Sequence, residues 1–324
     1  MAAAQDEETA PHGPSEAREE WLLAQPRLTL ASISPDCVPA GLTEVRLHLD
    51  WGNDFGWDQD KPGEAPRDRR FLVDGEHRTL ALQVRRGVRP GLDLSARLPL
   101  EWRGGGVLDG PIDWFHRVTG FPGNSRGSFL SDELRVTGRD DRGRLIRWSG
   151  EGTGIGRLEL QARRAAFGTA GASGPRASVV GSVGLPTGTG PFAVSGLGFG
   201  AQLVAALPVA RSWALYGGAG ATFETERRIE GVEYERARVH GFLSIEWRPA
   251  QRWGLLAETS AASRLVTNLA RYPALEWYLR LNARLNLASG WSFEGGFAEG
   301  LSNQQATTDF GIQAGLVRRL GVRR

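Results

Sequence analysis

The sequence predicts an all-β protein, a transmembrane, antiparallel, up-and-down β-barrel of about 12 strands with one long extracellular excursion that carries a short helix. Three observations lead to this fold. Long segments alternate between apolar and polar residues, the connections between these segments alternate between short and long, and most tryptophans lie close to the connections. Alternation with a period of two residues is typical of a strand that has one apolar and one polar face.

The clearest alternating segment is 279–287. Its odd positions are Leu, Leu, Ala, Leu and Leu, and its even positions are two arginines and two asparagines. After a turn at 288–290 the alternation resumes, with Trp291, Phe293 and Phe297 on one face. Strands of soluble sheets usually have about five or six residues, whereas a strand needs about nine to eleven residues to cross a bilayer. The length therefore favours a barrel whose apolar face meets lipid and whose polar face lines the lumen.

The other strands follow in order along the chain. Near the N-terminal end, alternation predicts strands at 45–51, 80–85 and 92–100, and the Pro-Gly pair at 90–91 is typical of a hairpin turn. We expect the remaining strands at 154–167, 176–186, 198–210, 213–225, 236–249, 253–266, 276–288, 291–302 and 307–320. The total is even, as it is in single-chain bacterial barrels.

The connections fall into two classes that alternate along the chain. Mostly short connections are predicted at 89–91, 168–175, 210–212, 249–252 and 288–290. Mostly longer ones are predicted at 52–70, 104–152, 187–197, 226–235, 267–275 and 303–306. Outer-membrane barrels have short periplasmic turns and longer outside loops. The pattern therefore places both ends of the chain in the periplasm.

Large aromatic residues are expected to form two girdles around the barrel. Trp213, Trp247, Trp253 and Trp291 lie next to the short connections, and Trp51, Trp102, Trp277 and Tyr278 lie near the longer loops. An indole ring has an apolar body and a polar N–H group, and the interface between membrane and water satisfies both. Packing in a soluble core would instead scatter these residues along the strands.

The chain is predicted to contain two parts. We expect residues 1–38 to be a flexible periplasmic N-terminal segment without a function of its own, since its composition is first acidic and then mixed and it precedes the first strand. Residues 39–324 then form the outer-membrane barrel. No secretory signal follows Met1, so we expect the leader of an outer-membrane protein to have been removed.

The longest interruption of the barrel is 104–152. A helix is predicted within it, because Ile112, Phe115 and Val118 have helical spacing, Trp114 lies beside them, and a Gly-Pro pair precedes and a glycine follows. An ordered excursion of this length tends to be a lid, a plug or a binding loop. These four apolar residues are therefore candidates for a lid. The alternative is a cap that only shields the rim.

One part of the sequence resembles a known family. The run FLVDGEHRTLALQVRRGVRPGLDLSARLPLEWRGGGVLDGPIDWFHRVTGFPGNSR at 71–126, with WGNDF at 51–55, resembles a bacterial family of uncharacterised predicted outer-membrane β-barrel proteins. Its most specific parts are PLEWRGGG at 99–106 and DWFH at 113–116. The resemblance extends from about residue 39 to the last strand and implies a location and a fold, with no established activity. One departure is that the last strand ends on Leu320 and a basic tail, whereas such barrels usually end on an aromatic residue.

The sequence offers few candidates for chemistry. It contains no HExxH spacing and no GxSxG nucleophile elbow, so we predict no metal site, no cofactor and no catalytic residue. Cys37 is the only cysteine, which excludes an intramolecular disulfide. The formal net charge of +2 is spread along the chain and argues against a nucleic-acid partner. His48 and His240 fall on the polar face of their strands, whereas a lipid-cleaving enzyme needs them on the lipid side.

The polar face predicts the residues that line the lumen. These candidates are Arg46, His48, Asp50, Arg85, Asp93, Arg97, Glu101, Glu159, Arg163, His240, Glu246, Glu258, Arg280, Arg284 and Glu294. Charges of both signs inside such a barrel form either a water-filled, weakly selective channel or an interior that neutralises and blocks itself.

The predicted function follows from this lumen. We expect a porin-like barrel in a bacterial outer membrane that serves passive or gated passage of a small solute, through or alongside the charged lumen, with outer-membrane lipid and an unidentified small solute as partners. The first alternative is a non-conducting barrel with a structural or partner-binding role. The second alternative is a lipid-modifying outer-membrane enzyme.

Overall fold

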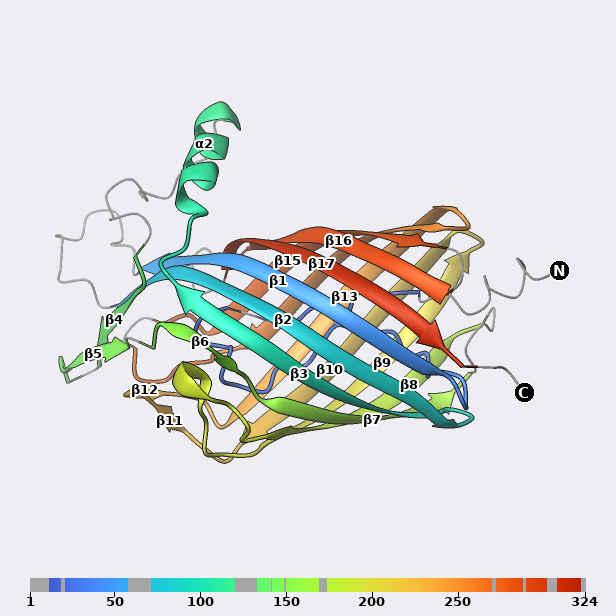
Figure 1. The fold of residues 1–324 in the computed structure, drawn as a ribbon, viewed down its shortest axis with the longest axis horizontal. Helices are drawn as coiled ribbons and strands as arrows, with labels where there is room; N and C mark the ends of the chain where they lie inside the picture. Colours follow the sequence, from blue (N-terminus) through green and yellow to red (C-terminus); the bar gives the residue numbers. More distant parts are fainter. Residues whose placement is uncertain are drawn as a thin grey trace.

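The computed structural model describes residues 12–18, 21–57, 71–119, 133–140, 142–148, 150–168, 174–269, 272–287, 290–301 and 308–321. In these residues twelve long strands form one closed antiparallel barrel (Figure 1). Each strand pairs with its neighbours in the chain, and the first strand pairs with the last, so the sheet has no open edge along the barrel. Closure gives every wall strand a hydrogen-bonding partner on both sides. A barrel in lipid requires this, because lipid offers no partners for unpaired backbone N–H and C=O groups.

The wall strands are β1 (Thr43–Trp57), β2 (Phe71–Arg89), β3 (Leu92–Gly104), β7 (Leu158–Phe167), β8 (Arg176–Leu185), β9 (Gly198–Ala210), β10 (Trp213–Glu224), β13 (Ala237–Ala250), β14 (Trp253–Ser263), β15 (Leu275–Asn286), β16 (Trp291–Gly300) and β17 (Thr308–Leu320). The register at the closure runs from Thr43 opposite Leu320 to Asp54 opposite Thr308. Strand β1 therefore begins, and β17 ends, at the end of the barrel where the short turns lie. The prediction of about 12 strands is confirmed.

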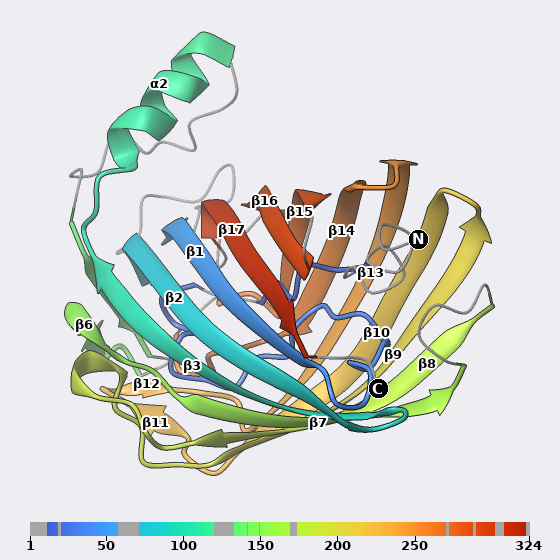
Figure 2. The same cartoon turned by 45° about the vertical axis from the view of Figure 1, so that its right-hand side comes forward.

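Shorter elements lie beyond the wall at the other end of the barrel. They are α2 (Asp109–Thr119), β4 (Arg135–Arg139), β5 (Leu145–Trp148), β6 (Gly152–Ile155), the single turn of 3-10 helix η2 (Gly190–Phe192), β11 (Arg228–Ile229) and β12 (Val232–Glu233). Strands β4 and β5 extend the sheet from β2, and β6 continues the pairing of β3. In Figures 1 and 2, α2 stands away from the barrel.

The alternation of the sequence appears directly as two faces of the wall. Leu47 and Leu49 on β1 are 43% and 38% exposed, whereas Arg46 and His48 between them are buried. The apolar residues point outward, and the polar residues point into the lumen. None of the helices in the described residues is long and apolar enough to cross a membrane.

The N-terminal segment corrects a prediction. We expected residues 1–38 to be flexible, but residues 12–18 and 21–38 lie inside the barrel, where Figure 2 shows them as a blue coil within the ring of strands. Trp21, Leu22 and Leu23 in this segment are 0% exposed. The physical reason is the diameter of the barrel, which grows with the number of strands. About eight strands enclose a space that their own side chains fill, and twelve strands enclose a larger one that further chain can occupy.

Candidate functional site

The filled lumen is the candidate site, and the N-terminal segment crosses it twice. Near its start, the carbonyl of Pro14 accepts a hydrogen bond from Arg284 at 3.4 Å. The backbone N–H of Leu22 donates at 2.9 Å to Asp54, which lies near the long-loop end of β1. The chain then returns, and the N–H of Val38 donates at 2.8 Å to Asp93, just after the short turn between β2 and β3. The segment therefore runs up to the long-loop end and back.

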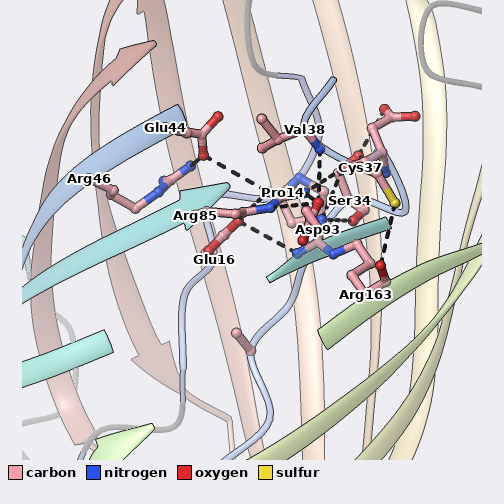
Figure 3. A network of polar contacts seen from close by, with 12 residues as sticks. Pro14, Glu16, Ser34, Cys37, Val38, Glu44, Arg46, Arg85, Asp93 and Arg163 are labelled. Atoms are coloured by element: carbon pink, nitrogen blue, oxygen red, sulfur yellow. Dashed lines mark hydrogen bonds and ion pairs between the residues drawn. The ribbon is translucent and has the colours of Figure 1, made fainter. Parts of the chain in front are cut away.

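At the short-turn end, charged groups hold the segment (Figure 3). Glu16 lies 3.3 Å from Arg85 and 3.9 Å from Arg163, and Arg85 also pairs with Asp93 at 2.9 Å. Burial alone would raise the pKa of Glu16, but Arg46, Arg85 and Arg163 hold that pKa below its ordinary value. The carboxylate of the segment is thus ionised and embedded among cations of the wall.

Halfway along the lumen, a second set of contacts joins the segment to the wall. Arg18 forms an ion pair of 2.7 Å with Glu159, which also lies 3.5 Å from Arg97. Arg280 donates to the carbonyl of Arg18 at 2.7 Å and pairs with Glu258 at 3.2 Å. Charges of the segment and of the wall are therefore interleaved.

Other ion pairs link the wall to itself. Glu294 on β16 accepts from Arg284 on the neighbouring β15 at 2.8 Å and, across β17, from Arg46 on β1 at 2.6 Å. Arg157 pairs with Glu224 at 2.7 Å, and Arg238 pairs with Glu276 at 2.7 Å. Sequence reasoning missed these last four residues. Glu224, Arg238 and Glu276 have the same parity as the inward residues of their own strands, which is the signal that would have found them.

At the long-loop end the contacts change to apolar ones. Trp21 packs with its ring centroid 6.1 Å from that of Tyr272, in a nearly parallel stack. The residues of this cluster, called here the mouth core, are Trp21, Leu22, Leu23, Ala24, Phe71, Val73, Val136, Ile146, Trp148, Val194, Ile229, Val232, Tyr234, Leu265, Val266, Leu269 and Tyr272. The turn of the N-terminal segment and several outside loops thus close the mouth together.

A buried histidine lies beside this turn. Both ring nitrogens of His77 face carboxylates, with Nε2 2.8 Å from Asp50 and Nδ1 2.7 Å from Asp54. The same oxygen of Asp54 accepts the N–H of Leu22. His77 therefore fixes the position of the Asp54 carboxylate, which in turn holds the backbone of Leu22 at the turn of the segment.

Two spaces left between the segment and the wall are small. One cavity of about 20 Å³ is lined by residues that include Arg18, Leu30 and Phe242, and another of about 20 Å³ by residues that include Arg97 and Glu159. Each is large enough for about one water molecule. These two spaces leave room for isolated waters, one of them beside the Arg18–Glu159 pair.

All of the residues predicted to line the lumen lie in wall strands and are buried: Arg46, His48, Asp50, Arg85, Asp93, Arg97, Glu101, Glu159, Arg163, His240, Glu246, Glu258, Arg280, Arg284 and Glu294. Within the described ranges, the carboxylate, histidine and cysteine side chains form no group that could hold a metal ion. The charged residues of the lumen can form ion pairs with the N-terminal segment, which closes the lumen, or can be hydrated where water enters.

The predicted girdles need one correction. Trp213, Trp247, Trp253, Trp277 and Trp291 are between 39% and 45% exposed on the outer face, and Trp51 and Trp102 are half-buried there. Tyr278, however, is 3% exposed and faces the lumen, where the guanidinium of Arg280 lies 5.0 Å from its ring. Adjacent strand residues point to opposite faces, so Tyr278 cannot share the outward direction of Trp277.

The lid candidates do not lie over the mouth. Ile112 is buried, Trp114 and Val118 are 60% and 66% exposed, and the side chain of Phe115 falls outside the described residues. Helix α2 points away from the barrel near its long-loop end (Figures 1 and 2). The later part of the excursion does reach the mouth core, through Val136, Ile146 and Trp148.

The chain is similar to several solved outer-membrane proteins. The COG4313 outer membrane channel from Pseudomonas putida F1 has a TM-score of 0.59 and 11% identity, with 89% of this chain and 98% of that chain covered. The KdgM porin has a TM-score of 0.44 and 8% identity, covering 85% and 98%. The translocator domain of the autotransporter NalP from Neisseria meningitidis has a TM-score of 0.46 and 11% identity, covering 86% and 87%. The likeness to the COG4313 channel concerns the fold, which does not by itself define a function.

A search of curated proteins finds no match to this sequence. A family of bacterial barrels was expected from the stretches at 51–55 and 71–126, and a family match covers almost the whole chain. The fold is that of outer-membrane channels, a closed antiparallel barrel of twelve strands with one short helix in the described residues. The match spans residues 2–320, and the chain belongs to the family described as "Protein of unknown function (DUF3187)".

Proposed function

We propose that the protein is an outer-membrane channel for small solutes in which residues 12–38 of the N-terminal segment act as a plug, and that solutes pass when this plug leaves the lumen. The observation that carries the proposal is the polar inner wall behind the plug. Among the described residues, buried charged side chains lie on every wall strand except β9 and β17, and both signs occur, so water would fill the lumen if the plug were absent.

The way in which the plug is held also supports the proposal. Within 12–18 and 21–38 no residue belongs to a strand of the barrel. Every wall strand keeps its two partners without the plug, because the ladders run around the closed ring. Displacing the plug therefore breaks side-chain contacts and single hydrogen bonds, and it leaves the barrel itself intact.

The size of the barrel fits such a channel. About eight strands leave an interior just filled by side chains, and sixteen to eighteen leave an open aqueous pore. A barrel of twelve strands lies between these limits, so one folded segment is enough to close it. The charged wall favours polar or charged solutes, since a polar solute can replace the water that hydrates these groups.

A second candidate is a non-conducting barrel with a structural role. The observation in its favour is the mouth core, in which the plug and the outside loops form a continuous apolar cluster. If this cluster never opens, the lumen stays closed and the barrel serves only as a stable support for its outside loops.

Removal of the plug separates the two candidates. A variant that lacks residues 12–38 and the unmodified protein are reconstituted in planar bilayers, after resistance to protease has shown that both are inserted. We expect large, steady conductance steps from the variant and rare or no steps from the unmodified protein. An inserted variant that is silent would overturn the proposal and leave the structural role.

A further inference from the structure

The base of helix α2 lies on the outside of the barrel wall. Outward-facing residues of β1, β2 and β3 form a row in which the guanidinium carbon of Arg78 is 4.5 Å from the ring centroid of Trp51 and 4.3 Å from that of Trp102. These are the tryptophans of the girdle on the long-loop side. The next outward pair toward the mouth is Asn53 opposite Glu76.

This next pair is covered by the chain that leads into the helix. The backbone N–H groups of Val107 and Leu108 donate to Glu76, and the side chain of Asn53 donates to Asp109 at 3.0 Å. Asn53 and Glu76 are 0% exposed although they belong to the outer face. Residues 107–109 are therefore attached to the outer surface of the wall and not to the rim of the lumen.

The height of this attachment relative to the membrane follows from strand geometry. Asn53 lies two residues beyond Trp51, which is roughly 7 Å along a strand and less along the membrane normal because the strands of such barrels tilt. The headgroup layer on each side of the hydrocarbon core is about 5–7 Å thick. The helix therefore starts within this layer if Trp51 and Trp102 mark the edge of the hydrocarbon.

The helix then exposes apolar side chains on one side. Trp114 and Val118 are 60% and 66% exposed and are four residues apart, so they lie on the same face of the helix. Val107 at its base is 59% exposed. Arg117 beside them is also exposed. Large exposed apolar side chains on an ordered element indicate a surface that another phase or molecule covers.

We infer that α2 lies on the outer leaflet as an interfacial helix. Trp114 and Val118 insert at the boundary between headgroups and acyl chains, and Arg117 extends its guanidinium toward anionic headgroup phosphates. The occupant is a lipid surface because this surface is continuous with the lipid-facing wall on which the helix is rooted. Indole rings, apolar side chains and arginine are the composition that such helices use. The inference requires a membrane-inserted barrel and does not depend on conduction through the lumen.

Depth-dependent quenching in vesicles tests the inference. Single cysteines replace Val118, Arg142 and Leu243 in a Cys37→Ser background, and each is labelled with an environment-sensitive fluorophore. Arg142 lies in the exposed turn between β4 and β5, and Leu243 is 67% exposed on the lipid face of β13. The full-length proteins are placed in vesicles of phosphatidylcholine and phosphatidylglycerol that carry nitroxides at the headgroup or deep in the acyl chain.

Each position has a distinct expected result. The label at position 118 should lose most of its emission to headgroup nitroxides and little to aqueous iodide. The label at position 142 should show the reverse, and the label at position 243 should respond to deep nitroxides, which establishes insertion separately from the position of the helix. A label at position 118 that behaves like the label at 142 would overturn the inference. The inference would also be overturned if protection of the label at position 118 from iodide increased with the number of proteins per vesicle. A second copy of the protein would then cover the helix.

Discussion

The two ends of the lumen hold the same segment by different means. At the short-turn end and halfway along, Glu16 and Arg18 are embedded among arginines and glutamates of the wall. At the long-loop end Trp21, Leu22 and Leu23 are fully buried in the mouth core. The short-turn half thus carries the ion pairs together with a smaller apolar cluster, in which Ala31 and Ile33 of the segment pack on the wall. The long-loop end carries the larger apolar cluster.

This difference indicates where opening is resisted. Water can replace an ion pair in a lumen that becomes hydrated, and exposed pairs contribute only about 0–1 kcal/mol. Water cannot replace apolar packing, and burying a large apolar side chain contributes about 1.5–3 kcal/mol. The three residues Trp21, Leu22 and Leu23 therefore resist displacement by roughly 5–9 kcal/mol together. Under the proposed function, the mouth core would therefore be the main seal, and the ionic contacts would set the path of the segment.

The largest effect is expected for Trp21→Ser, which tests the seal directly. Truncating a buried tryptophan costs about 3–5 kcal/mol, and every 1.4 kcal/mol is a factor of about ten in an equilibrium. The open probability in planar bilayers should therefore rise by more than about a hundredfold. The matched control is Trp114→Ser, which removes an exposed indole from α2 and should leave the conductance unchanged. If both variants conduct like the unmodified protein, the mouth core is not the seal.

An intermediate effect is expected for Asp54→Ala, which acts on the tip of the segment without touching its apolar side chains. The substitution leaves the N–H of Leu22 without its acceptor and takes one of two carboxylates from His77. A buried donor left unsatisfied costs about 1–3 kcal/mol, so the open probability should rise by about tenfold. The same bilayer recording measures it.

The control for this variant is Asp50→Ala. It takes the other carboxylate from His77 and leaves the hydrogen bond of Leu22 in place. A smaller effect than that of Asp54→Ala assigns the difference to Leu22. Equal increases in open probability for the two variants would show that His77, and not the hydrogen bond from Leu22 to Asp54, holds residues 21–23 in position.

The wall could be predicted from the sequence because its information is local. Period-two alternation alone identifies the strands, and it placed Arg280, Arg284 and Glu294 on the face that is buried in the structure. The error at Tyr278 arose because it was assigned to a girdle by its distance from a loop. Its parity, opposite to that of Trp277, already carried the correct direction.

The contents of the lumen could not be predicted in the same way. Residues 12–38 have no period, and their partners, such as Glu159 and Asp54, lie far away in the chain. The only local signal is the run Trp21, Leu22 and Leu23, since three large apolar residues are unfavourable in a solvated tail. The helix at 109–119 was predicted by its spacing, but its direction depends on the contacts of Glu76 and Asn53, which no local pattern reveals.

The smallest effect is expected for the ionic contacts, which a double-mutant cycle on Arg18 and Glu159 measures. In Arg18→Gln, Glu159 keeps Arg97 at 3.5 Å, and a cavity of about 20 Å³ beside the pair admits a water molecule. The loss should be about 1 kcal/mol or less, so the open probability should rise by less than tenfold. High salt should reduce the difference further, because mobile ions screen a hydrated pair.

The cycle with Glu159→Gln and the double variant isolates the coupling between the two side chains. A coupling free energy smaller than the free-energy change caused by Trp21→Ser would support the mouth core as the main seal. A coupling that exceeds it, and that salt does not reduce, would reverse the comparison. Removing one partner of an ion pair costs about 3–5 kcal/mol only where water is excluded, so the charged half of the lumen would then be the part that stays dry and holds the segment.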